Sequence, residues 1–201
     1  MGFEVSDRVR ELNARLEAFM EEHVYPREHA WNEFTLDQDN RWLTPPWFFE
    51  LQEKARDLGL WNLFLPHEYA PWSPGLTNVE IAPLFETMSK VSWAQAVFNC
   101  NAPDTGNMEV LIHYGSEEQK AEWLPKLLSG EIRSAFCMTE PEYAGSNPVE
   151  MGTRAKRDGD DYVIDGHKWF ATAADGAAFG ICMAVTDPAA GKYERASMIA
   201  N

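Results

Sequence analysis

The stretch of this chain that offers most chemistry lies at residues 136–147, which read F-C-M-T-E-P-E-Y-A-G-S-N. A short apolar run ends there, Pro141 breaks it, and small polar residues lead to Gly145 and Ser146. A strand that runs into such a loop offers backbone N–H groups and the hydroxyls of Thr139 and Ser146 with little side-chain bulk. Such groups suit a flat polar ring and a phosphate. On local composition alone, an ordinary Pro/Gly turn is the more common explanation.

The composition is that of a globular protein with a strongly acidic balance. Of the 201 residues, 45% are hydrophobic, so the chain can bury a sizeable core. The 32 acidic and 17 basic residues give a formal net charge of −15. This charge argues against a nucleic-acid backbone or an anionic membrane surface as the main partner. An anionic ligand stays open, because backbone N–H groups can bind a phosphate locally.

Cysteine and histidine positions favour neither disulfides nor a metal site. The three cysteines are dispersed and form no C-x-x-C pair: Cys100, Cys137 and Cys182. They predict reduced thiols and a cytoplasmic location, and no apolar run is long enough to span a bilayer. His23 and His29 stand among glutamates, on what we expect to be a solvated helix face, so no metal is predicted. The start of the chain fits the N-myristoylation pattern formally, and we discount this match.

The first 130 residues are predicted to form a helical domain. Apolar spacing and helix-end signals predict helices over 5–24, 47–58, 78–88, 92–100, 104–114 and 116–128. Pro26 is expected to end or kink the first helix, and 31–44 is expected to be irregular. Ser116 with Gln119 predicts a capped helix start. The large aromatic residues Trp47, Trp61 and Trp72 are expected to pack in the core and between helices.

Residues 131–201 are predicted to form a second, incomplete β domain. Strand-like runs occur at 132–138, 153–157, 162–164, 167–171, 179–185 and 197–200. Two Asp-Gly pairs, at 158–159 and 165–166, predict hairpin turns and therefore a meander of antiparallel strands. A helical block followed by a β block is an α+β arrangement.

The order of three motifs resembles the acyl-CoA dehydrogenase family. The motifs are L-P-K-L-L-S-G-E at 124–131, F-C-M-T-E-P at 136–141 with G-S at 145–146, and Y-V-I-D-G-H-K-W-F-A-T at 162–172. The loop after Pro141 is one residue longer than in short-chain and medium-chain members, as in the subgroup of family members 10 and 11. The resemblance implies an N-terminal helical domain and an antiparallel β-sheet or barrel domain, truncated before a C-terminal helical bundle.

The resemblance also implies FAD as cofactor and a set of residues that contact it. These are Phe136, Met138, Thr139, Gly145, Ser146, Phe170, Ala171 and Thr172. In the family, the first three positions border the isoalloxazine ring, and the Gly-Ser pair approaches the pyrophosphate and the thioester substrate. The aromatic ring at 170 packs on the flavin, and the hydroxyl at 172 reaches its N5 and O4 edge. Donors at that edge stabilise the charge that a hydride brings.

This chain differs from the commonest family pattern at two of these sites and at the neighbouring position 147. Asn147 stands where Asp is usual, Phe136 replaces a frequent Tyr, and Phe170 replaces a frequent Trp. The changes remove one charge near the phosphates and one hydroxyl, and they give a smaller stacking surface.

The activity implied by the resemblance is α,β-dehydrogenation of an acyl-CoA thioester to a trans-2-enoyl-CoA, with hydride passing to flavin N5. The implied partners are the acyl-CoA substrate, an electron-transferring flavoprotein and further copies of the chain in a homo-oligomer. The family's catalytic base is a glutamate of the C-terminal domain, which is absent here, so no catalytic residue is assigned. We interpret Glu140 and Glu142 as loop carboxylates.

Two other functions remain open at this point. One is a flavoprotein oxidase on the same scaffold, which direct oxygen consumption would distinguish from a dehydrogenase. The other is a non-catalytic interaction module that kept the α+β scaffold. The presence of Thr139, Gly145, Ser146 and Thr172 argues against a module, because a protein without flavin has no evident use for them.

Overall fold

A computed structural model describes residues 5–40 and 42–200. The chain divides into two compact units, Met1–Gly130 and Glu131–Asn201, which are described in turn. The first four residues of the N-myristoylation pattern lie outside the described residues.

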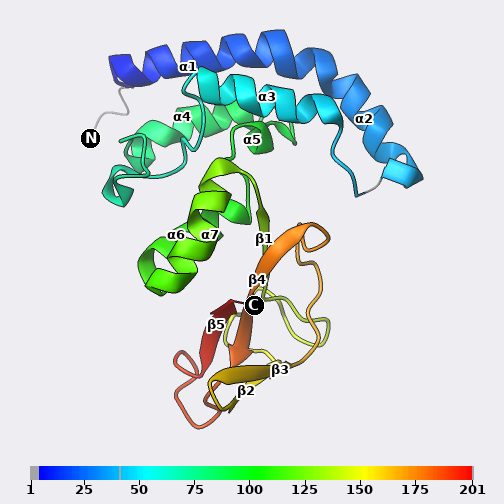
Figure 1. Ribbon diagram of the computed structural model, residues 1–201, viewed down its shortest axis with the longest axis vertical. Helices are drawn as coiled ribbons and strands as arrows, with labels where there is room; N and C mark the ends of the chain where they lie inside the picture. The colour runs from blue at the N-terminus through cyan, green and yellow to red at the C-terminus, as the bar shows by residue number, and fades with distance from the viewer. Residues whose placement is uncertain (1–4, 41, 201) are drawn as a thin grey trace. The chain divides into compact units, whose positions relative to one another are not determined.

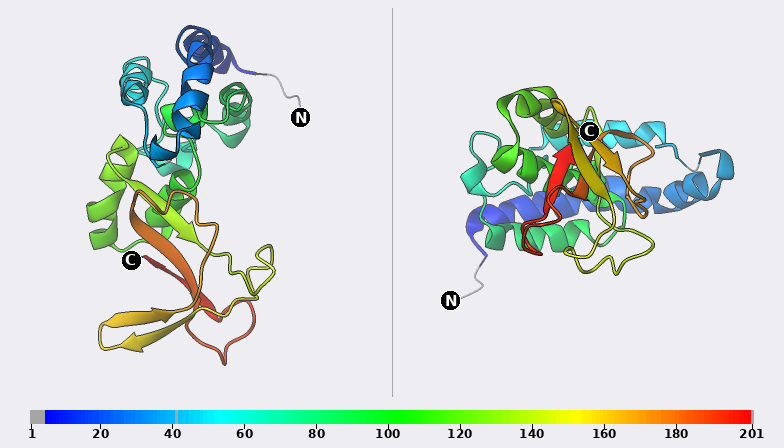
Figure 2. Two further views of the ribbon diagram at one scale, coloured as in Figure 1. Left: turned by 90° about the vertical axis from the view of Figure 1, so that its right-hand side faces the viewer. Right: turned by 90° about the horizontal axis from the view of Figure 1, so that it is seen from below.

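Helices and turns make up the first unit (Figure 1). In chain order they are α1 (Asp7–Phe19), the π-helical turn η1 (Met20–Val24), the 3-10 turn η2 (Tyr25–Arg27), α2 (Glu28–Leu36), η3 (Gln38–Asn40), α3 (Pro46–Asp57), η4 (His67–Tyr69), α4 (Asn78–Met88), α5 (Ala94–Val97), α6 (Asp104–Tyr114) and α7 (Glu117–Ser129). Helices α1, α3 and α4 run side by side, and the left view of Figure 2 shows them nearly end-on.

The helix starts follow the capping signals of the sequence. The Thr77 hydroxyl accepts from the backbone N–H of Glu80, whose carboxylate accepts in return from the N–H of Thr77 over 2.9 Å. Ser116 and Gln119 make the same reciprocal pair at the start of α7. Each pair satisfies two backbone donors that a helix start otherwise leaves open. The predicted helices at 47–58, 78–88, 104–114 and 116–128 are confirmed.

The α-helix α1 gives way to the turns η1 and η2 before α2 begins, so the first helix is interrupted around Pro26 as expected. Pro26 lies at the start of η2, where proline's missing N–H costs no hydrogen bond. Two other helix predictions were wrong. The segment 31–44 was expected to be irregular, but its residues 31–36 belong to α2 and are helical. The helix predicted over 92–100 is reduced to α5, since Asn99 has a left-handed φ of 52° that no helix accommodates.

The core of the first unit lies between the helices. Its largest fully buried side chains come from almost every helix and include Leu16, Met20, Leu51, Leu84, Met88, Phe98, Met108 and Leu124. Trp47 joins a ring cluster with Trp31 and Trp93, in which the last two stack at 4.9 Å. Trp61 packs under the guanidinium of Arg56 at 3.8 Å. The expected packing role was wrong for Trp72, whose side chain is 40% exposed.

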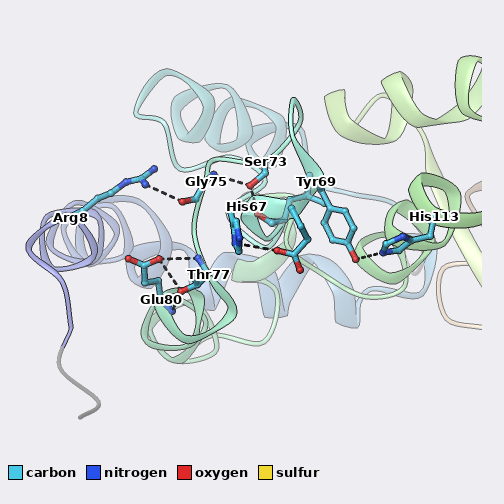
Figure 3. A network of polar contacts seen from close by, with 10 residues as sticks. Arg8, His67, Tyr69, Ser73, Gly75, Thr77, Glu80 and His113 are labelled. Carbon is cyan, nitrogen blue, oxygen red and sulfur yellow. Dashed lines mark hydrogen bonds and ion pairs between the residues drawn. The ribbon is translucent and has the colours of Figure 1, made fainter. Parts of the chain in front are cut away.

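A polar network fastens the long loop 66–76 to its neighbours (Figure 3). Arg8 of α1 donates to the carbonyl of Gly75 over 3.1 Å, and Ser73 donates to the carbonyl of Leu65 over 2.8 Å. At the other end, the Tyr69 hydroxyl lies 2.8 Å from Nε2 of His113 on α6. The loop is thus held by side chains of two helices as well as by its own turns.

Two asparagines close the C-terminal end of α7. Nδ2 of Asn99 donates to the carbonyl of Leu127 over 2.9 Å and to Oδ1 of Asn62 over 2.7 Å. Asn62 in turn donates to the carbonyl of Leu128 over 2.9 Å. The last carbonyls of a helix have no partner within it, so these amides replace the missing donors.

A sheet forms the centre of the second unit. Its strands are β1 (Arg133–Cys137), β2 (Arg154–Asp158), β3 (Asp161–Asp165), β4 (Ala177–Val185) and β5 (Ala196–Ala200). The order is β1-β4-β2-β3, with β5 paired to β4. The long strand β4 is therefore the central strand, which pairs with β1, β2 and β5, and the β2–β3 hairpin extends away from it (Figure 2).

The helical-then-β order and the α+β class are confirmed, but the sheet is mixed. β1 and β2 both pair with β4 in parallel, so the sheet is not the wholly antiparallel one that the resemblance had implied. Of the two Asp-Gly pairs, the first forms the β2–β3 hairpin, with Gly159 at φ 64°. After the second pair the chain leaves the sheet, and the strand predicted at 167–171 does not form. A Cβ on Gly166 would lie 2.7 Å from Cα of Thr153, so the chain turns away at a close backbone contact.

Three findings concern membranes, metals and thiols. Among the described residues, no helix is both long and apolar enough to cross a membrane, and no group of acidic, histidine and cysteine side chains could hold a metal ion. Cys100, Cys137 and Cys182 are all free.

His23 was expected to lie on a solvated helix face, and this was wrong, because its ring packs edge-on against Phe19 with the ring centroids 4.9 Å apart. Burial lowers the pKa of His23, and nearby Lys54 adds to the effect.

Candidate functional site

Two segments that leave the sheet lie against each other in the second unit. The first follows β1 at Met138, and the second follows β3 at Gly166. The backbone N–H of Trp169 donates to the carbonyl of Thr139 over 3.1 Å. This bond joins the 136–147 motif directly to the 162–172 motif. The structure therefore brings together two groups of residues that the sequence analysis selected separately.

A buried ion pair joins the same two segments. Nζ of Lys168 lies 2.8 Å from Oε1 of Glu140 and donates to the carbonyl of Met138 over 2.9 Å. The side chain of Lys168 is 12% exposed and that of Glu140 is 3% exposed. The other contacts of Glu140 are with backbone N–H groups of Gly152 and Thr153. One carboxylate thus connects three separate stretches of chain.

The electrostatics of Glu140 favour its ionised form. Burial alone would raise the pKa of this carboxyl, but the hydrogen bonds from Lys168, Gly152 and Thr153 outweigh that effect and lower the pKa to about 2. Charge-assisted hydrogen bonds to the ionised form act in this direction. A carboxylate with so low a pKa is a weak base, so Glu140 holds the loop and does not accept protons at neutral pH.

Close packing fixes the loop between the motif residues. A Cβ added to Gly145 would lie 2.7 Å from Cγ2 of Thr139, which shows how near the Gly-Ser pair comes to that threonine. A Cβ on Gly152 would similarly lie 2.8 Å from the ring of Tyr143. The 138–153 loop is therefore folded back on itself, with Thr139 and Gly145 in contact.

The second segment presents aromatic rings to the outside. Phe170 is 79% exposed and Trp169 is 43% exposed, and their ring centroids are 4.5 Å apart. Phe170 and Ala173 have left-handed φ angles of 52° and 67°. Such angles are costly in residues other than glycine, and strained backbone of this kind is frequent at ligand sites.

The remaining predicted positions flank this arrangement. Phe136 lies in β1 opposite Ile181 of β4 and is half-buried. Thr172 is exposed in the turn that leads to β4, and Ala171 beside it is half-buried. Among the described residues, the hydroxyls of Thr139, Ser146 and Thr172 have no hydrogen-bond partner. They are available as donors to a ligand.

Sequence reasoning missed the role of Lys168 and misjudged the setting of Glu140. The interpretation of Glu140 as a loop carboxylate gave no reason to expect its burial. The only local signal was that an acidic residue, Glu140, stands beside the turn of the first motif and a basic residue, Lys168, stands just after the turn of the second. Their contact spans 28 positions of sequence and depends on how two segments fold together.

Comparison with known families shows which family the chain belongs to. Residues 6–131 match the family described as acyl-CoA dehydrogenase, N-terminal domain, and residues 135–200 match acyl-CoA dehydrogenase, middle domain. The chain belongs to the acyl-CoA dehydrogenase family. The resemblance drawn from the three motifs, including its nearness to family members 10 and 11, is confirmed.

Relatives of this acyl-CoA dehydrogenase chain match it over nearly its whole length. It is 45% identical to acyl-CoA dehydrogenase family member 10 of Mus musculus, over 97% of the chain and 19% of that protein. Family member 11 of Gallus gallus is 43% identical over 98% of the chain, which corresponds to 26% of that protein. The chain thus spans about a fifth to a quarter of these relatives.

Solved structures of the family agree with the fold. A Mycobacterium abscessus protein of this family superimposes with a TM-score of 0.90 at 45% identity, over 98% of this chain and 50% of that one. A glutaryl-CoA dehydrogenase from Mycobacterium smegmatis, solved in complex with FADH2, gives a TM-score of 0.70 at 27% identity, over 91% of this chain and 44% of that one.

Proposed function

We propose that the chain supplies the N-terminal and middle domains of an FAD-dependent acyl-CoA dehydrogenase. The reaction is α,β-dehydrogenation of an acyl-CoA thioester to a trans-2-enoyl-CoA. The observation that carries the proposal is the contact between the two motif segments, made by Trp169 with Thr139 and by Lys168 with Met138 and Glu140. Family membership and a relative solved with FADH2 support the choice of cofactor.

The groups on these segments fit a flavin. The ring of Phe170 and the half-exposed ring of Trp169 offer apolar faces to a flat heterocycle. Thr139, Ser146 and Thr172 offer hydroxyl donors that nothing else in the described chain uses. Residues that would hold the cofactor are therefore Phe136, Met138, Thr139, Gly145, Ser146, Phe170, Ala171 and Thr172, with Ser146 also near the substrate.

When bound, FAD supplies the hydride acceptor at N5. The contribution of the chain is to bind and orient. The hydroxyls of Thr139 and Thr172 would donate hydrogen bonds that stabilise negative charge on the bound ring. The exposed aromatic rings would exclude water from it. The substrate proton goes to a base outside this site, because the low pKa of Glu140 disqualifies the one buried carboxylate here.

The partners belong to the same proposal. They are the acyl-CoA substrate, an electron-transferring flavoprotein that takes the electrons away, and further copies of the chain in a homo-oligomer. The three free cysteines favour a reducing compartment, and we place the protein in the cytoplasm.

The experiment is purification of the complete gene product and addition of acyl-CoA under anaerobic conditions. We expect bound flavin whose visible absorbance bleaches with substrate. A protein that stays colourless and cannot be reconstituted with FAD would end the proposal. Oxygen consumption with substrate alone would instead indicate a flavoprotein oxidase.

Two threonine variants supply the matched comparison. Thr172→Val removes an unused, exposed hydroxyl, so it is expected to weaken FAD retention without unfolding the protein. Thr35→Val removes a hydroxyl that bonds within α2, to the carbonyl of Trp31 at 2.9 Å. It should leave flavin content unchanged, whereas equal flavin content in both variants would count against the site.

A further inference from the structure

We infer that the ion pair of Glu140 and Lys168 is the positioning element of the site, which sets Thr139 against the 169–172 segment and so determines how tightly FAD is held. The inference deepens the proposed function and rests on it. Neither residue is expected to touch the cofactor, because both side chains point into protein contacts and are largely buried.

The first step of the argument is the register of the two segments. Lys168 donates through its side chain to the carbonyl of Met138, and Trp169 donates through its backbone to the carbonyl of Thr139. Consecutive residues of one segment thus meet consecutive residues of the other, outside any strand. A slip of one position would break both bonds, so the two bonds together fix the register.

The second step is the way Glu140 holds Lys168 in place. A lysine side chain has several freely rotating bonds and would otherwise reach Met138 only part of the time. The carboxylate lies 2.8 Å from the ammonium and is itself held by the N–H groups of Gly152 and Thr153, just before β2. The sheet thereby orients the acid, the acid orients the lysine, and the lysine orients the Met138 carbonyl.

The third step separates position from stability. A buried ion pair often adds little net stability, because both charges lose their hydration, and a neutral pair of similar size can replace it at little cost. Removing one partner alone is much worse, since it leaves an unpaired buried charge. The charged pair makes directional bonds to Met138, Gly152 and Thr153, and an apolar pair of similar size could not make them.

The test compares three variants of the full chain: Lys168→Met, Glu140→Gln and the double variant. Matched controls are Lys156→Met, an exposed lysine of β2, and Glu150→Gln, an exposed acid of the same 138–153 loop as Glu140. For each protein, the dissociation constant for FAD is measured by flavin fluorescence, the melting temperature without FAD by circular dichroism, and amide hydrogen exchange at Trp169 by mass spectrometry.

We expect Lys168→Met to lower the melting temperature and to raise the FAD dissociation constant at least about tenfold. The double variant should regain most of the melting temperature, because no buried charge is left unpaired, and yet keep the weak FAD binding and the fast exchange at Trp169. Both controls should behave as the wild type. If FAD affinity follows the melting temperature in every variant, the pair is only structural and the inference is overturned.

The two proposals fail in different ways. If the wild-type chain binds no FAD, the proposed function falls, while exchange at Trp169 still reports whether the pair fixes the two segments. If the wild type binds FAD and the double variant binds it equally well despite fast exchange at Trp169, the positioning role falls and the proposed function stands.

Discussion

The backbone N–H of Trp169 and the carbonyl of Thr139 are joined by a hydrogen bond of 3.1 Å. The bond lies where two loops leave one sheet, beside the ion pair of Glu140 and Lys168. It turns two sequence motifs into one surface, and the following predictions concern the contacts that hold this surface and the helical unit.

Stability should depend on Glu140 at acidic pH. The pKa of this carboxyl falls from its usual 4.5 to about 2 in the folded chain. Because the folded-state pKa is the lower one, the stabilisation is present above about pH 4.5 and is lost as the pH falls towards 2. The shift corresponds to about 3 kcal/mol of unfolding free energy.

Urea unfolding at pH 7 and at pH 3 measures this contribution. The difference in unfolding free energy between wild type and Glu140→Gln should be large at pH 7 and should shrink at pH 3. The exposed control Glu150→Gln should show the same dependence of unfolding free energy on pH as the wild type. A difference between wild type and Glu140→Gln that does not change with pH would contradict the assignment.

Substituting Gly166 should destabilise the second unit. A Cβ there would lie 2.2 Å from Oγ1 and 2.7 Å from Cα of Thr153, and the backbone atom cannot move aside easily. We expect Gly166→Ala to cost about 1–3 kcal/mol. Gly176→Ala is the control, because no atom lies within 4 Å of a Cβ at that glycine. Equal melting temperatures for the two variants would show that the close contact is absent.

The two Asp-Gly pairs show which turns could be predicted from the sequence and which could not. Asp158-Gly159 and Asp165-Gly166 are the same dipeptide, and both were expected to form hairpins. The first does, since its neighbours pair as β2 and β3. The second does not, because Gly166 meets Thr153, and that contact is invisible to local reasoning.

Local signals sufficed elsewhere. The capping box at Ser116 depends on residues three positions apart and was predicted from the sequence. The capping box at Thr77 has the same spacing to Glu80, although it was not predicted. The candidate site shows the same contrast between local signals and contacts of residues far apart in the sequence. Its motif positions came from the sequence by resemblance, whereas the link between Glu140 and Lys168 depends on the path of the chain through β2, β3 and the loop between them.

The asparagine pair at the end of α7 should contribute strongly to the helical unit. Asn99→Ala removes buried hydrogen bonds to Leu127 and Asn62 and places alanine at a φ of 52°. We expect a loss of about 2–3 kcal/mol in unfolding free energy. Within the described part of the chain, the amide of Asn101 bonds only to the adjacent Ala102 carbonyl, so Asn101→Ala should stay within about 0.5 kcal/mol of wild type. If chemical denaturation gave similar losses of unfolding free energy for Asn99→Ala and Asn101→Ala, the capping role of Asn99 would be refuted.

The contact of Tyr69 with His113 should control local opening of the 66–76 loop. Tyr69→Phe removes a bond that is largely exposed, so a cost of only about 0.5 kcal/mol is expected. Amide exchange at Trp72, which bonds to the Tyr69 carbonyl at 3.0 Å, should quicken about twofold. Tyr114→Phe, which removes a hydroxyl from the residue next to His113 on α6, serves as control. Unchanged exchange at Trp72 in Tyr69→Phe would mean that the other contacts of the loop suffice.

The central claim is that the 136–147 and 166–172 segments together form a flavin-binding surface. Amide hydrogen exchange of the purified chain with and without saturating FAD tests it most directly. We predict slower exchange on FAD addition at residues 138–146 and 168–172, with no change in the β2–β3 hairpin at 154–165. No protection in either segment, or protection confined to the hairpin, would contradict the account.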